Sequence, residues 1–336
     1  MVEVKANKNR VWRKLLAFVC AAGLAFLLYQ LFYYPIFDTV AGIGYQPSAE
    51  MSAVIDNIEL TDKGMRILRA SRPELQDATA FSQNCPNVST ETSTLGCYYA
   101  RHIYVFDVDN AELNGIKEAV LAHELLHAVW ERSDDTTKQQ LDQLLQQTYV
   151  ANQAELSEHM DSYESAEFTD ELHSVIGTQL DYATLDETLR DHYAAYFKNP
   201  SKIVAYFKAY DALLTGQRRT AIAMLSEIQS KKAEIERRSA AYEQSFNQLS
   251  QDIDNYNYRA GQGYHSESER IALERERNNL IARQTALNQE YDAISALVDD
   301  VNRQIGSYND LVEHLSGLFE SIDSSAKPSE VDYRMN

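Results

Sequence analysis

The sequence predicts a mostly helical α+β chain with a single N-terminal transmembrane helix, a small domain with a short sheet, and a long antiparallel coiled-coil hairpin. Three observations lead to this prediction. Residues 15–37 are uncharged, two histidines lie four residues apart on one predicted helix, and from residue 221 apolar residues repeat about every 3.5 positions. With 336 residues, of which 44% are hydrophobic, the chain is long enough to bury a core.

The N-terminus has the pattern of a membrane anchor. Residues 1–14 form a basic tail with five Lys or Arg, and the 23 uncharged residues that follow would rise about 34 Å as a helix, enough to cross a bilayer. The apolar stretch is longer than that of a usual signal peptide and no A-x-A site ends it, which favours an uncleaved anchor over a cleaved signal. By the positive-inside rule, we expect a single-pass protein of the cell membrane with a cytoplasmic N-terminus and an extracytoplasmic remainder.

Composition limits the partners and indicates the redox environment. The formal net charge of −19 speaks against a nucleic-acid partner. Cys85 and Cys97 are the only cysteines after the predicted anchor, and they flank a loop rich in Pro, Asn, Ser and Thr. In an exported chain this arrangement predicts a disulfide between them.

The stretch His123-Glu124-Leu125-Leu126-His127 is the strongest functional signal. Spacing of i, i+4 on a helix lets both imidazoles reach one metal ion, and Glu124 can take a proton from a water beside that ion. The segment 114–130 is apolar on most sides, so the helix is buried and two histidines without partners would be desolvated. The pattern predicts a zinc site and peptide hydrolysis; the alternative is a pair of core histidines bonded to backbone groups.

The elements around this helix follow from local patterns. Residues 103–108 are β-branched and aromatic, which predicts a strand before the helix, and 65–71 are predicted as a second strand that pairs with it. A polar helix is expected from Asp135 to about Tyr163. In the stretch 168–177, Thr169 and Gly177 are suitable caps, which predicts a short helix that begins near Glu171.

The third ligand distinguishes classes of zinc peptidase. Enzymes with HExxHxxGxxH use a His six residues after the second ligand, and Ser133 occupies that position, which excludes their class. The strand, the HExxH helix and Glu171-Leu172-His173-Ser174 resemble the gluzincins, in which a Glu on a later helix completes the site. The resemblance, over about residues 50–200, implies zinc ligands His123, His127 and Glu171.

The resemblance also implies roles for other parts of the domain. Glu124 would be the general base, and the edge strand of the sheet would bind substrate backbone. A His or Tyr near the third ligand would stabilise the oxyanion, and we assign this role to His173, with His192 and Tyr193 as alternatives.

The chain departs from the larger gluzincins at one position. Val175 occupies the place of the Asp in their E-x-x-x-D pattern, so the resemblance is to minimal gluzincins. Glu164 and Glu167 remain alternative third ligands. On the preceding acidic helix, we interpret the titratable residues as a solvated face rather than as ligands; these are Glu155, Glu158 and His159.

The region 217–320 is predicted to be a coiled-coil hairpin. Two heptad frames, one from Leu225 to Tyr256 and one from Leu273 to Leu315, flank a glycine-bearing break, and pairing them places the midpoint at Gly263. The pairing sets Ile235 against Tyr291 and Phe246 against Leu280, within one chain. Polar residues at three a positions weaken the seam, which suits a rod that docks a protein partner along its length; these are Lys232, Ser239 and Arg277.

Together these predictions give one function and one alternative. Residues 38–214 are expected to form a membrane-anchored, extracytoplasmic zinc metallopeptidase domain that acts on a protein or peptide, with an endopeptidase favoured, and 321–336 a polar tail. The alternative is a non-catalytic cell-surface binding or scaffold protein that uses the hairpin, with a structural zincin domain. An intact Glu124 favours the enzyme.

Overall fold

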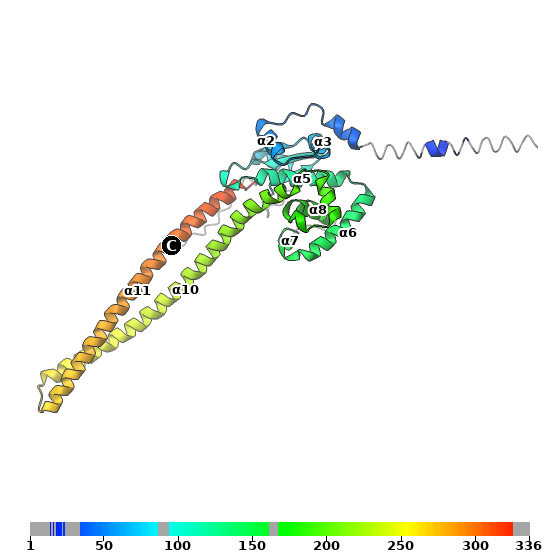
Figure 1. Ribbon diagram of the computed structural model, residues 1–336. Coiled ribbons are helices and arrows are strands. Elements are labelled where there is room, and N and C mark those ends of the chain that lie inside the picture. Colours follow the sequence, from blue (N-terminus) through cyan, green and yellow to red (C-terminus); the bar gives the residue numbers. More distant parts are fainter. Residues whose placement is uncertain are drawn as a thin grey trace, which may run out of the picture. The chain divides into compact units, whose positions relative to one another are not determined.

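The computed structural model describes residues 14, 16, 18–21, 23, 34–86, 94–160 and 167–324. They divide into two compact units: the residues up to Leu213 together with those from Leu318 onward, and the residues Leu214–Gly317. The structure is mostly helical, with one small sheet and two long helices (Figure 1). The elements of the first unit before the long helices are α2 (Ala49–Asn57), α3 (Asp62–Ala70), β1 (Glu74–Gln76), α4 (Ala78–Asn84), β2 (Gly96–Tyr99), β3 (His102–Phe106), η1 (Ala111–Leu113), α5 (Ile116–Arg132), α6 (Asp135–Ala151), α7 (Gln153–Met160), α8 (Phe168–Gln179), η2 (Tyr182–Thr184) and α9 (Glu187–Ala194).

The predicted membrane anchor is corrected by the structure. Among the residues that are described, no helix has both the length and the apolar character needed to cross a bilayer. A crossing needs about 20 apolar residues in one helix. The prediction of a transmembrane helix at 15–37, and with it the single-pass membrane localisation, is therefore wrong for the part that is described. Most of 15–37 and all but one residue of the basic tail lie outside the described residues.

The sheet has three strands in the order β1-β3-β2. β1 runs parallel to β3, with Leu75 opposite Val105, and β2 runs antiparallel to β3, with Gly96 opposite Val105. The strand predicted before the HExxH helix is present as β3, and it is the central strand. The edge next to the HExxH helix is β2, which the sequence pattern did not predict.

The predicted strand at 65–71 is wrong, because this segment lies in α3. The Thr61 hydroxyl accepts a hydrogen bond from the Gly64 backbone N–H at 3.1 Å and caps the helix. Ile67 and Leu68 are buried on one face of α3. The strand that pairs with β3 instead begins after Pro73, as β1.

The core of the first unit is organised around α5. This helix contacts β2, β3, α2, α3 and α8, and Figure 1 shows it alongside α8. Its N-cap residue is Gly115, whose φ of 93° lies in the left-handed region that glycine adopts without strain. The buried apolar side chains of α5 are Ile116, Ala119, Leu121, Ala122, Leu125, Leu126, Ala128 and Val129. Because these cover most of its circumference, the HExxH helix is fixed within the core.

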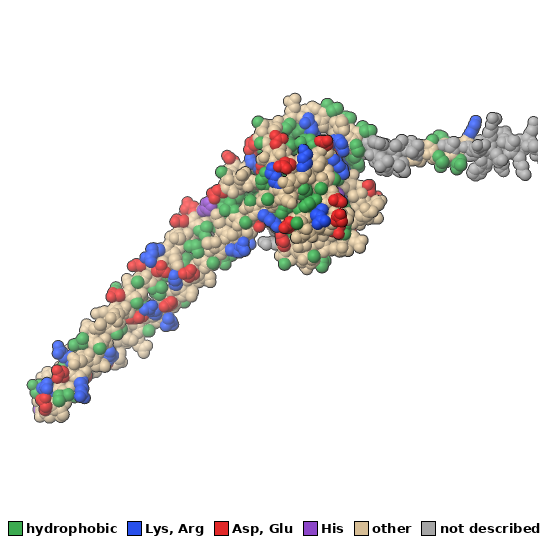
Figure 2. All heavy atoms as spheres, viewed as in Figure 1, with side chains coloured by type: hydrophobic (Ala, Val, Ile, Leu, Met, Phe, Trp, Pro, Cys, Tyr) green, Lys and Arg blue, Asp and Glu red, His purple; other side chains and the backbone are tan. Residues whose placement is uncertain are grey.

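Two long helices, α10 (Pro200–Gly261) and α11 (Glu267–Ser321), run antiparallel, and the second unit consists of their parts between Leu214 and Gly317 with the turn that joins them. Arg238 donates hydrogen bonds of 2.7 and 2.9 Å to Glu290, and Arg283 donates one of 2.6 Å to Asp252, so residue numbers fall along one helix as they rise along the other. One buried apolar cluster of the pair consists of Ala221, Ile228, Val301, Tyr308 and Leu315, and Leu249 and Leu280 are also buried. On the face shown in Figure 2, acidic, basic and apolar side chains are interspersed along these helices.

The register of the hairpin differs in places from the predicted one. The rings of Tyr242 and Tyr291 lie 6.0 Å apart, whereas the pattern pairs Tyr291 with Ile235, one heptad away. Phe246 was expected to pack against Leu280 in the seam, yet Phe246 is 53% exposed and Tyr291 is 59% exposed. Heptad periodicity is unchanged by a shift of seven residues, so the pattern alone did not fix this register.

Candidate metal centre

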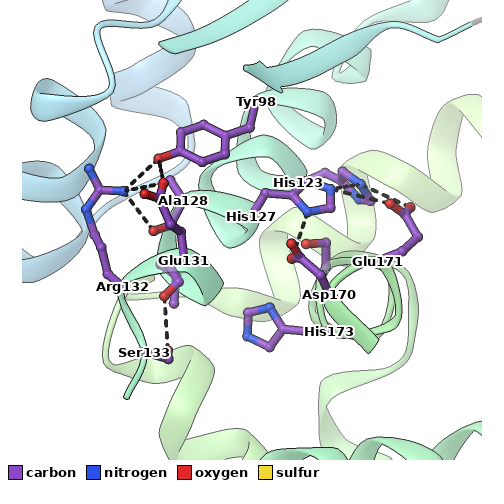
Figure 3. Close-up of polar contacts among 12 residues, drawn as sticks. Tyr98, His123, His127, Ala128, Glu131, Arg132, Ser133, Asp170, Glu171 and His173 are labelled. Carbon is purple, nitrogen blue, oxygen red and sulfur yellow. Dashed lines mark hydrogen bonds and ion pairs between the residues drawn. The ribbon is translucent and has the colours of Figure 1, made fainter. Parts of the chain in front are cut away.

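Three side chains from two helices converge at one point (Figure 3). His123 and His127 lie one turn apart on α5, and Glu171 reaches them from the first turn of α8. The two imidazole Nε2 atoms are 3.1 Å apart. The Glu171 carboxylate lies 3.3 Å from His123 Nε2 through Oε1 and 3.4 Å from His127 Nε2 through Oε2.

These separations fit the ligand set of one tetrahedral ion. Ligand atoms that bind a zinc-sized ion at 2.0–2.1 Å in tetrahedral geometry lie about 3.3 Å from one another. The two Nε2 atoms are 3.1 Å apart, and each lies 3.3 or 3.4 Å from a different oxygen of Glu171. One ligand atom from each of the three residues lies within 4.8 Å of the other two. The donor set is two imidazole nitrogens and one carboxylate, so these residues could hold a metal ion and leave its fourth position open.

Asp170 orients the second histidine. Its Oδ1 lies 2.9 Å from Nδ1 of His127, and because a carboxylate can only accept, Nδ1 carries the proton and Nε2 faces the other donors. Burial lowers the pKa of His127, but the hydrogen bonds to Asp170 and Glu171 outweigh burial and hold the pKa well above its usual value. The sequence prediction missed Asp170, although it directly precedes Glu171 on the same helix turn.

Glu171 is held in its charged form. Burial raises its pKa, but the charges and hydrogen bonds of His123 and His127 outweigh burial and lower the pKa below its usual range. When no cation is bound, the buried carboxylate of Glu171 is therefore stabilised by protons on the two imidazoles that face it. Binding of a cation at this point would displace those protons, so its affinity would depend on pH.

Glu124 lies on α5 beside the first histidine and under the edge strand. It is 6% exposed, and burial raises the pKa of its carboxyl group. Gly96 of β2 faces it closely: a β-carbon added at Gly96 would lie 2.7 Å from Glu124 Oε1 and 2.5 Å from Val120 Cγ1. The predicted base thus directly follows the first of the three donors in the sequence, and the backbone of β2 covers it.

The three candidates for the oxyanion role lie together in a separate cluster. The Nε2 atoms of His173 and His192 are 2.8 Å apart, and the Tyr193 hydroxyl donates to the backbone carbonyl of His173 at 2.8 Å. The His173 ring is fully buried, 5.1 Å from the Trp130 ring, and burial lowers its pKa well below the usual value. In Figure 3, His173 lies apart from the donors, with no contact drawn to them. The oxyanion role of His173 stays a prediction.

The alternative ligands are not part of the donor group. Glu155 and Glu167 are exposed, and the described residues contain one group of three His, Cys, Asp or Glu side chains with metal-binding spacing, the group with Glu171. Glu164 and the side chains of Glu158 and His159 lie outside the described residues. α8 begins at Phe168, and the Thr169 hydroxyl donates to Asp142 at 3.0 Å instead of capping the helix.

A second polar network fixes β2 at the other end of α5 (Figure 3). Arg132 donates a hydrogen bond of 3.0 Å to the Tyr98 hydroxyl, which also bonds Glu131. Arg132 also donates to both carboxylate oxygens of buried Asp38, at 2.9 and 3.0 Å. The predicted disulfide is confirmed: Cys85 at the end of α4 is bonded to Cys97 in β2. The two residues of β2 that follow Gly96, namely Cys97 and Tyr98, therefore fix this strand to neighbouring elements.

The arrangement has three side chains that could hold a metal ion and a buried carboxylate beside the first of them, which are groups that metal-assisted hydrolysis uses. Glu171 and both histidines lie together, as the resemblance implies, whereas Asp170 and Gly96 become apparent only in three dimensions. Comparisons of the chain with protein-family models, with curated proteins and with solved structures found no match.

Proposed function

We propose that this chain is a zinc-dependent peptidase of the minimal gluzincin kind, and that it acts on protein or peptide substrates as an endopeptidase. The observation that carries the proposal is the convergence of His123, His127 and Glu171, of which one ligand atom each lies within 4.8 Å of the other two. Two imidazoles and one carboxylate with an open fourth position are the donor set of catalytic zinc. Hard cations such as Mg²⁺ and Ca²⁺ favour sets made of oxygen alone.

The chemistry divides between the ion and the side chains. A zinc ion held by the three donors would act as a Lewis acid and lower the pKa of a water in its open position. Glu124 takes a proton from that water while the water oxygen adds to the peptide carbonyl carbon. Glu124 then gives the proton to the leaving nitrogen as the C–N bond breaks.

The side chains around the donors supply orientation. Asp170 keeps the proton of His127 on Nδ1, so that Nε2 presents its lone pair to the ion. Glu171 is ionised by its two histidine neighbours and needs no proton removed before it can bind a cation. These roles follow from hydrogen-bond geometry and do not involve the separate His173 cluster.

The test is zinc content measured together with hydrolysis. The purified full chain should contain about one zinc per molecule and should cleave a denatured protein; a chelator should abolish cleavage, and added Zn²⁺, but not Mg²⁺, should restore it. A chain that binds no zinc and cleaves nothing would favour the binding or scaffold alternative. In support of that alternative, the hairpin exposes several large apolar side chains, namely Ile222, Phe246, Tyr258, Tyr264, Ile281 and Tyr291.

The orienting role of Asp170 gives a graded prediction. Asp170→Ala should weaken zinc affinity by roughly 10–100-fold, because His127 loses the acceptor that fixes its tautomer. The measurement is competition with a chromogenic chelator. The matched control is Asp142→Ala, which removes a carboxylate that bonds α8 through Thr169 and is not bonded to His127. Equal affinities in the two variants would contradict the role.

A further inference from the structure

The edge strand β2 passes over the predicted base, Glu124, at Gly96, which is the one glycine of this strand. Gly96 is the first residue of β2, and an ideal β-carbon there would lie 2.7 Å from Glu124 Oε1 and 2.8 Å from Glu124 Cγ. Ordinary van der Waals contact begins at 3.4 Å, so any larger residue at 96 would force this contact to open by about 0.7 Å. The carboxylate of Glu124 thus lies in space that exists because residue 96 is glycine.

The strand has little freedom to move away from Glu124. Gly96 is paired with Val105 in the antiparallel ladder, and the residue before it accepts a hydrogen bond of 2.8 Å from the Phe106 backbone N–H. The next residue, Cys97, is held by its disulfide, and Tyr98 is held by Arg132 and Glu131. A side chain at 96 would therefore displace the flexible Glu124 rather than the strand.

We propose that Gly96 is a positioning residue: it lets β2 close over the Glu124 side chain and so sets where this carboxylate meets the reacting water. The inference rests on the proposed function, since it concerns the base of that reaction. A displacement on the order of 1 Å at a reacting group can lower a rate by about 100-fold. The glycine therefore contributes to the chemical step without contacting substrate.

The contact itself can be tested without activity. The test compares the melting temperature of the full chain with and without Gly96→Ala, in chelator, in a Val120→Ala background that removes the nearby Cγ1 atom and relieves folding. Overpacking should lower the melting temperature by roughly 3–10 °C. When Glu124→Ala is added to the same background, the loss caused by Gly96→Ala should fall by at least half. An equal loss in both backgrounds would overturn the inference, since Glu124 would then not be what the methyl group meets.

The functional part is tested with zinc-loaded protein. Relative to Val120→Ala alone, the Gly96→Ala/Val120→Ala variant should keep its zinc content and a KM within about 3-fold, while kcat falls by roughly 10–100-fold. The control is Gly64→Ala in α3, which places a β-carbon 2.4 Å from the backbone carbonyl oxygen of Tyr196, a residue outside the donor group. It should lose stability and keep kcat.

The outcomes separate the two ideas. An unchanged kcat in the folded Gly96→Ala/Val120→Ala variant, or an equal loss in the Gly64→Ala control, would overturn the positioning role and leave the proposed function standing. If the reference protein binds no zinc and has no activity, the proposed function fails. The positioning role then fails with it, even where the melting-temperature comparison confirms the contact.

Discussion

Replacing Glu124 with Gln is expected to lower kcat by roughly 10²–10⁴-fold while zinc stays bound. The substitution keeps the size of the side chain and leaves the donors His123, His127 and Glu171 in place, but an amide cannot take the proton of the attacking water. The measurements are zinc content and the rate of cleavage of a denatured protein, both on the full chain. Loss of zinc together with activity would show instead that Glu124 supports the donor group.

The matched control for this prediction lies on the same helix. Glu118 is also a buried carboxylate of α5, and it accepts a hydrogen bond of 2.8 Å from Asn57 instead of facing the donor group. Glu118→Gln should keep kcat, because its carboxylate is not the proposed base. If Glu124→Gln cleaves as fast as Glu118→Gln, the proposed mechanism is wrong.

The two histidines of the candidate metal site could be predicted to lie together because their geometry is local. Two histidines at i, i+4 share a face of any helix, and the apolar pattern of 114–130 fixes that helix in a core. Glu171 required a resemblance, since no spacing rule connects α8 to α5. The disulfide followed from there being two cysteines after residue 37.

The predictions that failed depended on contacts between distant segments or on cues that fit two structures. Residues 65–71 are apolar enough for a strand, but the Thr61 cap makes them part of α3. β2 has four residues and is defined by its pairing with β3, which a local pattern does not show. The contact of Gly96 with Glu124 joins residues 28 positions apart, and the hairpin register could shift by one heptad without any change in pattern.

The third ligand gives the second large expected effect. Glu171→Ala should weaken zinc affinity by on the order of 10²–10³-fold, because it removes one of the three protein donors, the one that carries a negative charge. Zinc at 100 times its dissociation constant stabilises a folded protein by about 2.7 kcal/mol. The melting temperature of the wild type should therefore rise by several degrees with zinc, and that of Glu171→Ala should rise much less at the same concentration.

Two carboxylates provide the controls that make this test specific. Glu167 precedes α8 and Glu155 lies on α7; both are exposed and neither belongs to the donor group. Glu167→Ala and Glu155→Ala should keep wild-type zinc affinity and the zinc-induced rise in melting temperature. Loss of zinc in Glu167→Ala with retention in Glu171→Ala would move the third ligand to the start of α8. Retention in all three variants would mean that the histidines bind the ion without a carboxylate from this part of the chain, and the gluzincin assignment would fall with it.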